Sequence, residues 1–117
     1  MAGEASCIFC KIVRAEIAST VVHRDDRVLA IEDVNPQAPV HLLVLPLEHH
    51  GTLGELIASG KLEIANAVLE TATKLGSERG GAAGFRLVVN TGADGGQTVG
   101  HVHVHVLAGR PMHWPPG

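Results

Sequence analysis

The sequence predicts an α+β domain built on an antiparallel sheet, and three observations support this fold class. The chain has 117 residues, of which 45% are hydrophobic and 18% are charged, so it has the length and the apolar content of one folded domain. Strand-like segments follow one another with few long crossovers, which favours antiparallel pairing over a doubly wound parallel sheet. A single long segment has the period of an amphipathic helix. We therefore expect one domain over residues 1–117.

Five segments have the composition and length of strands. The first two are separated by Asp25-Asp26, which predicts a hairpin. Asn35-Pro36 and Ala38-Pro39 then force an extended connection into an apolar run that Pro46 ends. The expected strands are Thr20–His23, Arg27–Glu32, Val40–Leu45, Phe85–Asn90 and Val99–Leu107.

The helices are expected between the third and fourth strands. Thr52 and Glu55 have the spacing of a capping box, which predicts a short helix to Ala58. Over Lys61–Leu75, apolar residues recur at three- and four-residue intervals, so a second helix is expected there. Residues 9–14 suit one helical turn. The proline-rich tail 110–117 cannot continue a strand or helix.

Composition excludes several classes of partner. The net charge is −3 and the nine basic residues are scattered singly, so no basic stripe is available for a nucleic acid backbone. The apolar runs are far too short to cross a bilayer. The N-terminal residues MAGEASCIFC lack the basic and apolar regions of a secretory signal. We therefore expect a cytoplasmic protein that binds neither nucleic acid nor membrane.

Histidine is the unusual residue of this composition. The chain has eight histidines, and three of them, His101, His103 and His105, fall within five positions. Because side chains alternate along a strand, these three are expected on one face while Val102, Val104 and Val106 bury the other. The function is expected to lie at this row of imidazoles.

Two chemistries suit such a row. Histidines can bind zinc, but three alternate positions on one strand span roughly 13–14 Å, which is too far for all three to share one ion. Alternatively, a neutral imidazole attacks an electrophile such as phosphorus while a neighbour supplies charge or a proton. The glycine-rich loop Gly92–Gly96, with Gln97 and Thr98, would then offer N–H donors to a phosphate, unless it is an ordinary hairpin loop.

Cys7 and Cys10 are the only cysteines and form a Cys-x-x-Cys motif. In a cytosolic chain this motif suggests metal or redox chemistry before a disulfide. A redox pair normally opens a helix in a βαβ unit, which is not expected here. A zinc site needs two further ligands, for which His49, His50 and His101 are candidates. Alternatively, the two reduced thiols pack as small hydrophobes.

The run from His101 to Val106 matches the His-φ-His-φ-His-φ-φ signature of the histidine triad superfamily of nucleotide hydrolases and transferases, where φ is hydrophobic. The chain also resembles the histidine triad nucleotide-binding (Hint) branch in four further stretches. The proline-rich end favours that branch over the fragile-histidine diadenosine polyphosphate hydrolases. The four stretches are Cys7–Val13, Asn35–His41, Asn90–Thr98 and Trp114–Gly117.

The resemblance implies a five-stranded antiparallel sheet with two helices, continued across a homodimer. It also implies a phosphoramidase that acts on purine nucleotides of the AMP or GMP type and needs no cofactor for catalysis. By position His103 would be the nucleophile, forming a nucleotidyl-histidine, and His41 would orient it. His101 and His105 complete the catalytic set.

The resemblance also implies a nucleotide-binding set. Asp33 would accept the ribose hydroxyls, unless it only caps a turn, and the apolar base slot would otherwise be plain core. Asn90 could likewise only cap its loop. Ile31 and Gly100 depart from the family pattern, which often has an aromatic and a bulky residue there. The implied contacts are Ile8, Phe9, Ile12, Ile31 and Val34 for the base, and His103, His105, Asn90, Gly96, Gln97 and Thr98 for the phosphate.

Bacterial relatives with this Cys-x-x-Cys bind structural zinc, and the matching set here is Cys7, Cys10, His49 and His101. With zinc bound, His101 would be a structural ligand, and His103 and His105 would carry the chemistry. Three other functions stay open from the sequence. They are a nucleotide-binding regulatory module with incidental turnover, a protein that only binds zinc, and a dinucleoside polyphosphate hydrolase.

Overall fold

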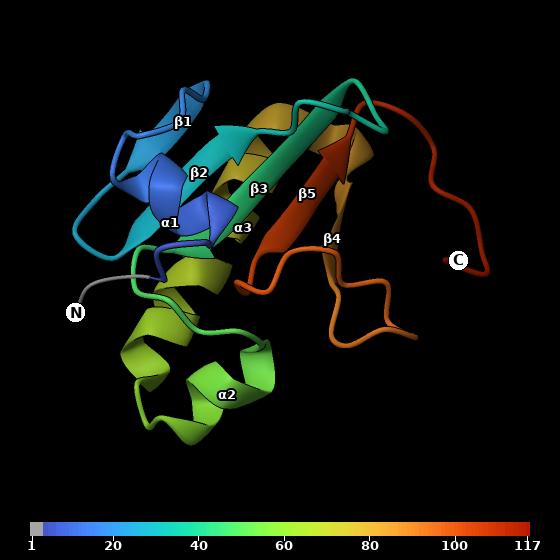
Figure 1. Ribbon diagram of the computed structural model, residues 1–117. Coiled ribbons are helices and arrows are strands. Elements are labelled where there is room, and N and C mark those ends of the chain that lie inside the picture. Colours follow the sequence, from blue (N-terminus) through green and yellow to red (C-terminus); the bar gives the residue numbers. More distant parts are fainter. Residues whose placement is uncertain (1–3) are drawn as a thin grey trace.

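The computed structural model describes residues 4–117 and contains one five-stranded antiparallel sheet (Figure 1). The strand order is β1-β2-β3-β5-β4, so β3 lies at the centre. This confirms the predicted fold class. The elements are α1 (Ile8–Val13), β1 (Val21–Arg24), β2 (Val28–Glu32), β3 (Val40–Pro46), α2 (Leu53–Ala58), α3 (Leu62–Gly80), a 3₁₀ turn (Gly81–Ala83), β4 (Phe85–Val89) and β5 (Val104–Ala108).

The two faces of the sheet are covered by different helices. Helix α3 lies behind the sheet and α1 lies in front of β2 and β3 (Figure 1). Alternation along the strands separates the two cores, because Val44 and Val106 pack toward α3 while Leu43 and Leu45 pack toward α1. The valine face of the histidine segment is therefore buried against α3, as predicted.

Hydrogen bonds between residues close in sequence form the β1–β2 turn and the start of α2. Oδ1 of Asp25 accepts the backbone N–H groups of Arg27 (2.8 Å) and Val28 (2.8 Å), which forms the predicted β1–β2 hairpin. Thr52 Oγ1 caps α2 by accepting the N–H of Glu55 at 3.0 Å. The Glu55 carboxylate accepts the N–H of Gly51 at 3.1 Å rather than that of Thr52, so the capping box reaches one residue further back than expected.

Two element boundaries differ from the sequence prediction by five residues each. Helix α3 continues to Gly80, five residues past Leu75. It can run close to the sheet because Gly76 faces Phe85, where a Cβ would lie 2.4 Å from the ring.

No helix in the described part of the chain is long and apolar enough to span a membrane.

The last strand was predicted to begin at Val99 but begins at Val104. Its partner β3 pairs as far as Val44 opposite Val104, and beyond this point residues 99–103 leave the ladder. His101 and His103 therefore precede the strand, and only His105 belongs to it. This departure from the sheet allows His101 to turn toward α1.

Candidate active site and metal site

Three histidines gather on the face of the sheet that α1 covers. His41 comes from β3 and His105 from β5, while His103 directly precedes β5. The ring centroids of His105 lie 5.2 Å from His41 and 5.0 Å from His103. His41 and His103 are buried and His105 is half-buried. The structure thus brings together three of the four predicted catalytic histidines.

The ring of His103 is held by a backbone carbonyl. Its Nδ1 lies 2.8 Å from the carbonyl oxygen of His101, and Phe9 meets the ring edge-on with centroids 5.0 Å apart. Because a carbonyl oxygen only accepts hydrogen bonds, Nδ1 carries the proton of the neutral ring. Nε2 of His103 therefore has a free lone pair.

The backbone N–H of Gln37 determines which ring nitrogen carries the proton in the other two histidines. The N–H of Gln37 donates to Nδ1 of His41 at 3.0 Å, so the proton of neutral His41 sits on Nε2. That nitrogen lies 2.9 Å from Nδ1 of His105 and donates a hydrogen bond to it. His105 consequently carries its own proton on Nε2.

His41 was expected to orient His103, but its nearest imidazole partner in the structure is His105. The orienting contact on His103 is the His101 carbonyl. His41 Nε2 also lies 3.3 Å from Oδ2 of Asp33. The hydrogen bond from Gln37 explains the arrangement, because it turns the proton-bearing side of His41 toward His105 and Asp33.

Burial favours the neutral forms of His41 and His105. Burial lowers the pKa of His41, and the carboxylate of Asp33 only partly opposes this effect. Burial, with like charge on His103 and His41, lowers the pKa of His105 to about 4. At neutral pH, His105 is therefore uncharged and acts as a hydrogen-bond donor through Nε2.

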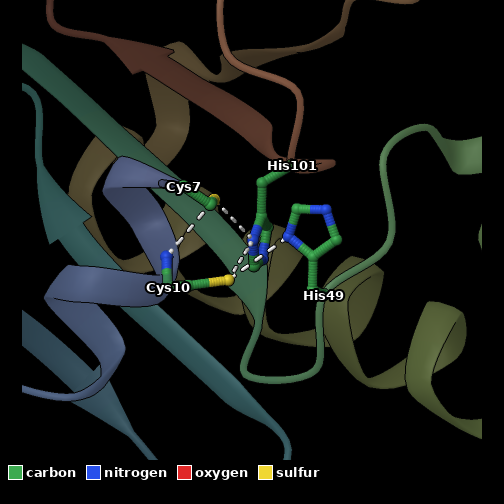
Figure 2. A group of neighbouring side chains, drawn as sticks. All are labelled: Cys7, Cys10, His49 and His101. Atoms are coloured by element: carbon green, nitrogen blue, oxygen red, sulfur yellow. Dashed lines mark hydrogen bonds between the residues drawn. The ribbon is translucent and has the colours of Figure 1, made fainter. Parts of the chain in front are cut away.

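The second cluster joins α1 to two distant segments (Figure 2). Cys7 is the N-cap of α1 and Cys10 lies in its first turn, while His49 follows β3 and His101 precedes β5. The four ligand atoms all lie within 4.8 Å of one another, and both cysteines are free thiols. This is the metal set that the sequence predicted.

The distances in this cluster suit a tetrahedral zinc site. Zn–S bonds of about 2.3 Å and Zn–N bonds of about 2.0–2.1 Å separate a sulfur from a nitrogen ligand by about 3.6 Å. His101 Nδ1 lies 3.5 Å from Cys7 Sγ and 3.6 Å from Cys10 Sγ. His49 Nδ1 lies 3.2 Å from Cys10 Sγ. The residues present therefore fit a structural Zn²⁺.

The surroundings of the cluster also suit metal binding. The side chain of His101 is completely buried, and its Nε2 donates to the carbonyl of Pro46 at 2.9 Å, which leaves Nδ1 free to coordinate. Burial raises the pKa of the Cys10 thiol, so binding an ion there would release a proton.

Asp33, His41 and His105 also lie within metal-binding distance of one another. This group does not fit a metal site, because the N–H of Gln37 occupies Nδ1 of His41 and leaves the proton on the nitrogen that would have to coordinate. We therefore interpret it as a hydrogen-bonded chain.

The glycine-rich loop differs from its expected role. The N–H groups of Gly92, Gly96 and Gln97 all donate within the loop and are not aimed at a ligand. The Gln97 amide donates to the carbonyls of Gly51 (2.7 Å) and Val99 (3.0 Å). Asn90 donates to Gly95 at 2.7 Å, as the capping alternative predicted. Thr98 is exposed.

The expected base slot divides into buried and exposed residues. Phe9 and Ile31 belong to the core under α1 and Ile12 packs against it. Ile8 and Val34 are 47% and 98% exposed, so these two apolar side chains are open to a ligand. Asp33 caps its turn by accepting the N–H of Asn35 at 2.8 Å.

Sequence analysis missed two backbone groups that organise the site. They are the N–H of Gln37 and the carbonyl of Pro46, which fix the tautomers of His41 and His101. The only sequence signal was their position, because Gln37 lies between the two prolines before β3 and Pro46 ends that strand.

Comparison with known proteins agrees with this description. A family model described as HIT domain matches residues 14–112. Adenylylsulfatase HINT1 of Arabidopsis thaliana is 45% identical over 116 residues, which cover 98% of this chain and 79% of the relative. The 14 kDa zinc-binding protein of Brassica juncea is 46% identical, with 94% of this chain and 98% of the relative covered.

A solved structure is similar over nearly the whole chain. The HIT family hydrolase from Legionella pneumophila Philadelphia 1 superposes with a TM-score of 0.88 at 45% identity, covering 96% of this chain and 100% of the other. The fold and the site define a small α+β protein with clustered histidines on one face of an antiparallel sheet. The chain belongs to the HIT domain family.

The depressed pKa of His105 predicts acid sensitivity. As pH falls from about 6.5 toward 4, His105 binds a proton in the unfolded chain but not in the folded one, so acid favours unfolding. The free energy of unfolding, measured with urea at pH 7 and pH 5, should therefore be lower at pH 5. In His105→Gln the loss between the two pH values should be smaller. An equal loss in variant and wild type would contradict the assignment.

Proposed function

We propose that the protein is a hydrolase that cleaves purine nucleoside 5′-phosphoramidates through a nucleotidyl-histidine intermediate on His103. One observation carries the proposal. The Nδ1–H of His103 is bound to the His101 carbonyl, which leaves a free lone pair on Nε2. The centroid of the His105 ring, which carries its proton on Nε2, lies 5.0 Å from that of His103. A neutral nucleophile next to a proton donor is the pair that this reaction requires.

The two steps follow from these proton positions. Nε2 of His103 attacks the α-phosphorus, the P–N bond breaks, and the amine leaves with the proton of His105 Nε2, so His105 becomes its conjugate base and keeps the hydrogen bond from His41 Nε2. The imidazolium formed at His103 keeps its Nδ1–H bond to the His101 carbonyl, which stabilises its charge. Water then attacks the phosphorus and gives one proton to His105 Nε2, the bond between phosphorus and His103 Nε2 breaks, and the nucleoside monophosphate leaves.

We assign nucleotide contacts to residues around this pair. The exposed apolar side chains of Ile8 and Val34 suit a purine face, with Phe9 and Ile31 as the packed layer beneath. Asp33 would accept the ribose hydroxyls. At the phosphate, Thr98 is the exposed candidate donor, while Asn90, Gly96 and Gln97 act mainly by shaping the loop.

We further propose that Zn²⁺ binds Cys7, Cys10, His49 and His101 as a structural ion. The donor distances and the Pro46 contact support this, and a relative carries the name of a zinc-binding protein. Bound zinc would supply a cross-link between α1 and the segments that hold the two histidines. Two reduced thiols suit the cytosol, where we expect the protein to act.

We also propose a homodimer in which β4 continues the sheet into a second copy. Strand β4 is an edge strand whose residues are all only half-buried, and an exposed edge is a template for pairing. A solution mass of one 12.2 kDa chain at micromolar concentration would rule out the dimer.

Removing the nucleophile should abolish turnover. His103→Ala is expected to lower the rate of amine release from an adenosine 5′-phosphoramidate by about 10³-fold or more at neutral pH. His23→Ala, in β1, serves as the matched control because the ring of His23 bonds to Asp25 on the surface and to no other side chain among residues 4–117. Equal rates in His103→Ala and the control would contradict the proposal.

The same assay separates the other functions. Adenylyl sulfate is included as a substrate because the Arabidopsis relative is named as an adenylylsulfatase. A dinucleoside polyphosphate is included to test the alternative polyphosphate hydrolase activity. Faster cleavage of either would replace the P–N assignment. Binding of AMP without significant turnover of any substrate would favour a nucleotide-binding regulatory module.

Zinc binding is tested by comparing variants of two adjacent histidines, His49 and His50. His49 faces Cys10, while His50 bonds to Glu48 at 3.0 Å. Elemental analysis of protein purified without chelator should find about one zinc per chain in the wild type and in His50→Asn, and little in His49→Asn. Absence of zinc from the wild type would refute the site.

A further inference from the structure

The segment that carries His101 and His103 lies outside the hydrogen-bonded ladder of the sheet. Residues 97–103 form neither helix nor strand. They are tied instead to the segment after β3, because Val102 N–H donates to the His50 carbonyl at 2.7 Å and Gln97 donates to the Gly51 carbonyl at 2.7 Å. The position of His103 therefore depends on how these two segments are joined.

The cysteine and histidine cluster joins the same two segments. His49 belongs to one, His101 belongs to the other, and both thiols come from α1 (Figure 2). An ion shared by these four residues would cross-link three parts of the chain that are far apart in sequence.

His101 contacts both sites at once. Its Nδ1 faces the thiols at 3.5 and 3.6 Å, and its carbonyl oxygen holds Nδ1 of His103 at 2.8 Å. Phe9, two residues from Cys7, meets the rings of both histidines edge-on, with centroids 5.8 Å from His101 and 5.0 Å from His103. A change in the position of His101 is thus transmitted to His103 by one hydrogen bond and one shared packing surface.

We propose that zinc at the Cys7, Cys10, His49 and His101 cluster and nucleotide at His103 bind cooperatively, with His101 as the positioning residue that couples them. The proposal rests on the function proposed above and adds a coupling between its two sites. Zinc fixes the ring of His101, and with it the carbonyl that keeps the proton of His103 on Nδ1. Nucleotide bound at His103 in turn favours the arrangement in which the zinc ligands converge.

One side of the cluster faces a cavity. Cys7 and His49 line this cavity of about 450 Å³, together with Thr98, Val99 and Gly100. Gly100 leaves the space open, because a Cβ there would meet no atom within 4 Å. Cys10 and His101 are buried, so the cavity is the side from which an ion would reach the cluster.

The coupling is measured first as a pair of affinities. The zinc dissociation constant is determined by competition with a chromophoric chelator, with and without saturating AMP. The AMP dissociation constant is determined for zinc-loaded and zinc-free protein. We expect each ligand to tighten the other by the same factor, on the order of fivefold or more. Independent affinities would overturn the proposal.

Imidazole NMR separates positioning of His103 from general stabilisation. In zinc-loaded protein, His103 should be the single Nδ1–H tautomer, and in zinc-free protein it should lose this preference. His41 is the internal control, because the N–H of Gln37 sets its tautomer away from the metal ligands. An unchanged His103 would contradict the proposal. Loss of order at His41 as well would also contradict it, since zinc would then act on the whole fold.

Two variants of one ligand complete the test. His49→Cys keeps four zinc donors as a Cys₃His set, so it should retain both the His103 tautomer and the coupling. His49→Asn should lose both while its His41 signal stays unchanged. A wild-type protein that binds no zinc would refute the zinc site, one that binds no AMP would refute the nucleotide site, and either result would overturn the coupling. Binding of both ligands with independent affinities would refute the coupling alone.

Discussion

The structure depends most on the contacts of one buried side chain, His101. Its Nε2 donates to Pro46, its Nδ1 faces two thiols, and its carbonyl accepts from His103. These three contacts occupy both ring nitrogens and the carbonyl oxygen of a residue that water cannot reach. No other residue type offers both a metal-ligating nitrogen and a second, proton-bearing nitrogen for the strand end. His101 thus links the end of β3, the start of β5 and helix α1.

Backbone groups, rather than charges, determine where the protons of the histidine cluster lie. A carbonyl keeps a proton on His103 Nδ1, and an N–H keeps one away from His41 Nδ1. Burial lowers the pKa of His41 and His105, so the rings are neutral and their two nitrogens have different roles. The result is one nitrogen that can attack and one N–H that can donate, on rings whose centroids lie 5.0 Å apart.

Much of this was predictable from the sequence because it is local or periodic. The hairpin at Asp25, the valine face of the last strand and the helix after Lys61 follow from turn chemistry and periodicity. The spacing of Cys7 and Cys10 predicted a metal site that the fold does assemble with His49 and His101. The hairpin, the valine face and the helix need no knowledge of distant contacts, whereas the choice of His49 and His101 came from the resemblance to a family.

The differences arise where distant segments meet. The alternating pattern predicted a strand from Val99, but pairing with β3 ends at Val104, opposite Val44, before β3 itself ends at Pro46. The contacts of Val102 with His50 and of His101 with Pro46 hold the chain outside the ladder. The partner of His41 depended on a backbone N–H that periodicity does not reveal. The central claim is that Nε2 of His103 is the nucleophile. Peptide mapping of protein quenched during turnover of an adenosine 5′-phosphoramidate tests it most directly. The account predicts an adenylyl group on His103 alone, and adenylylation of His105 or His41 would contradict it.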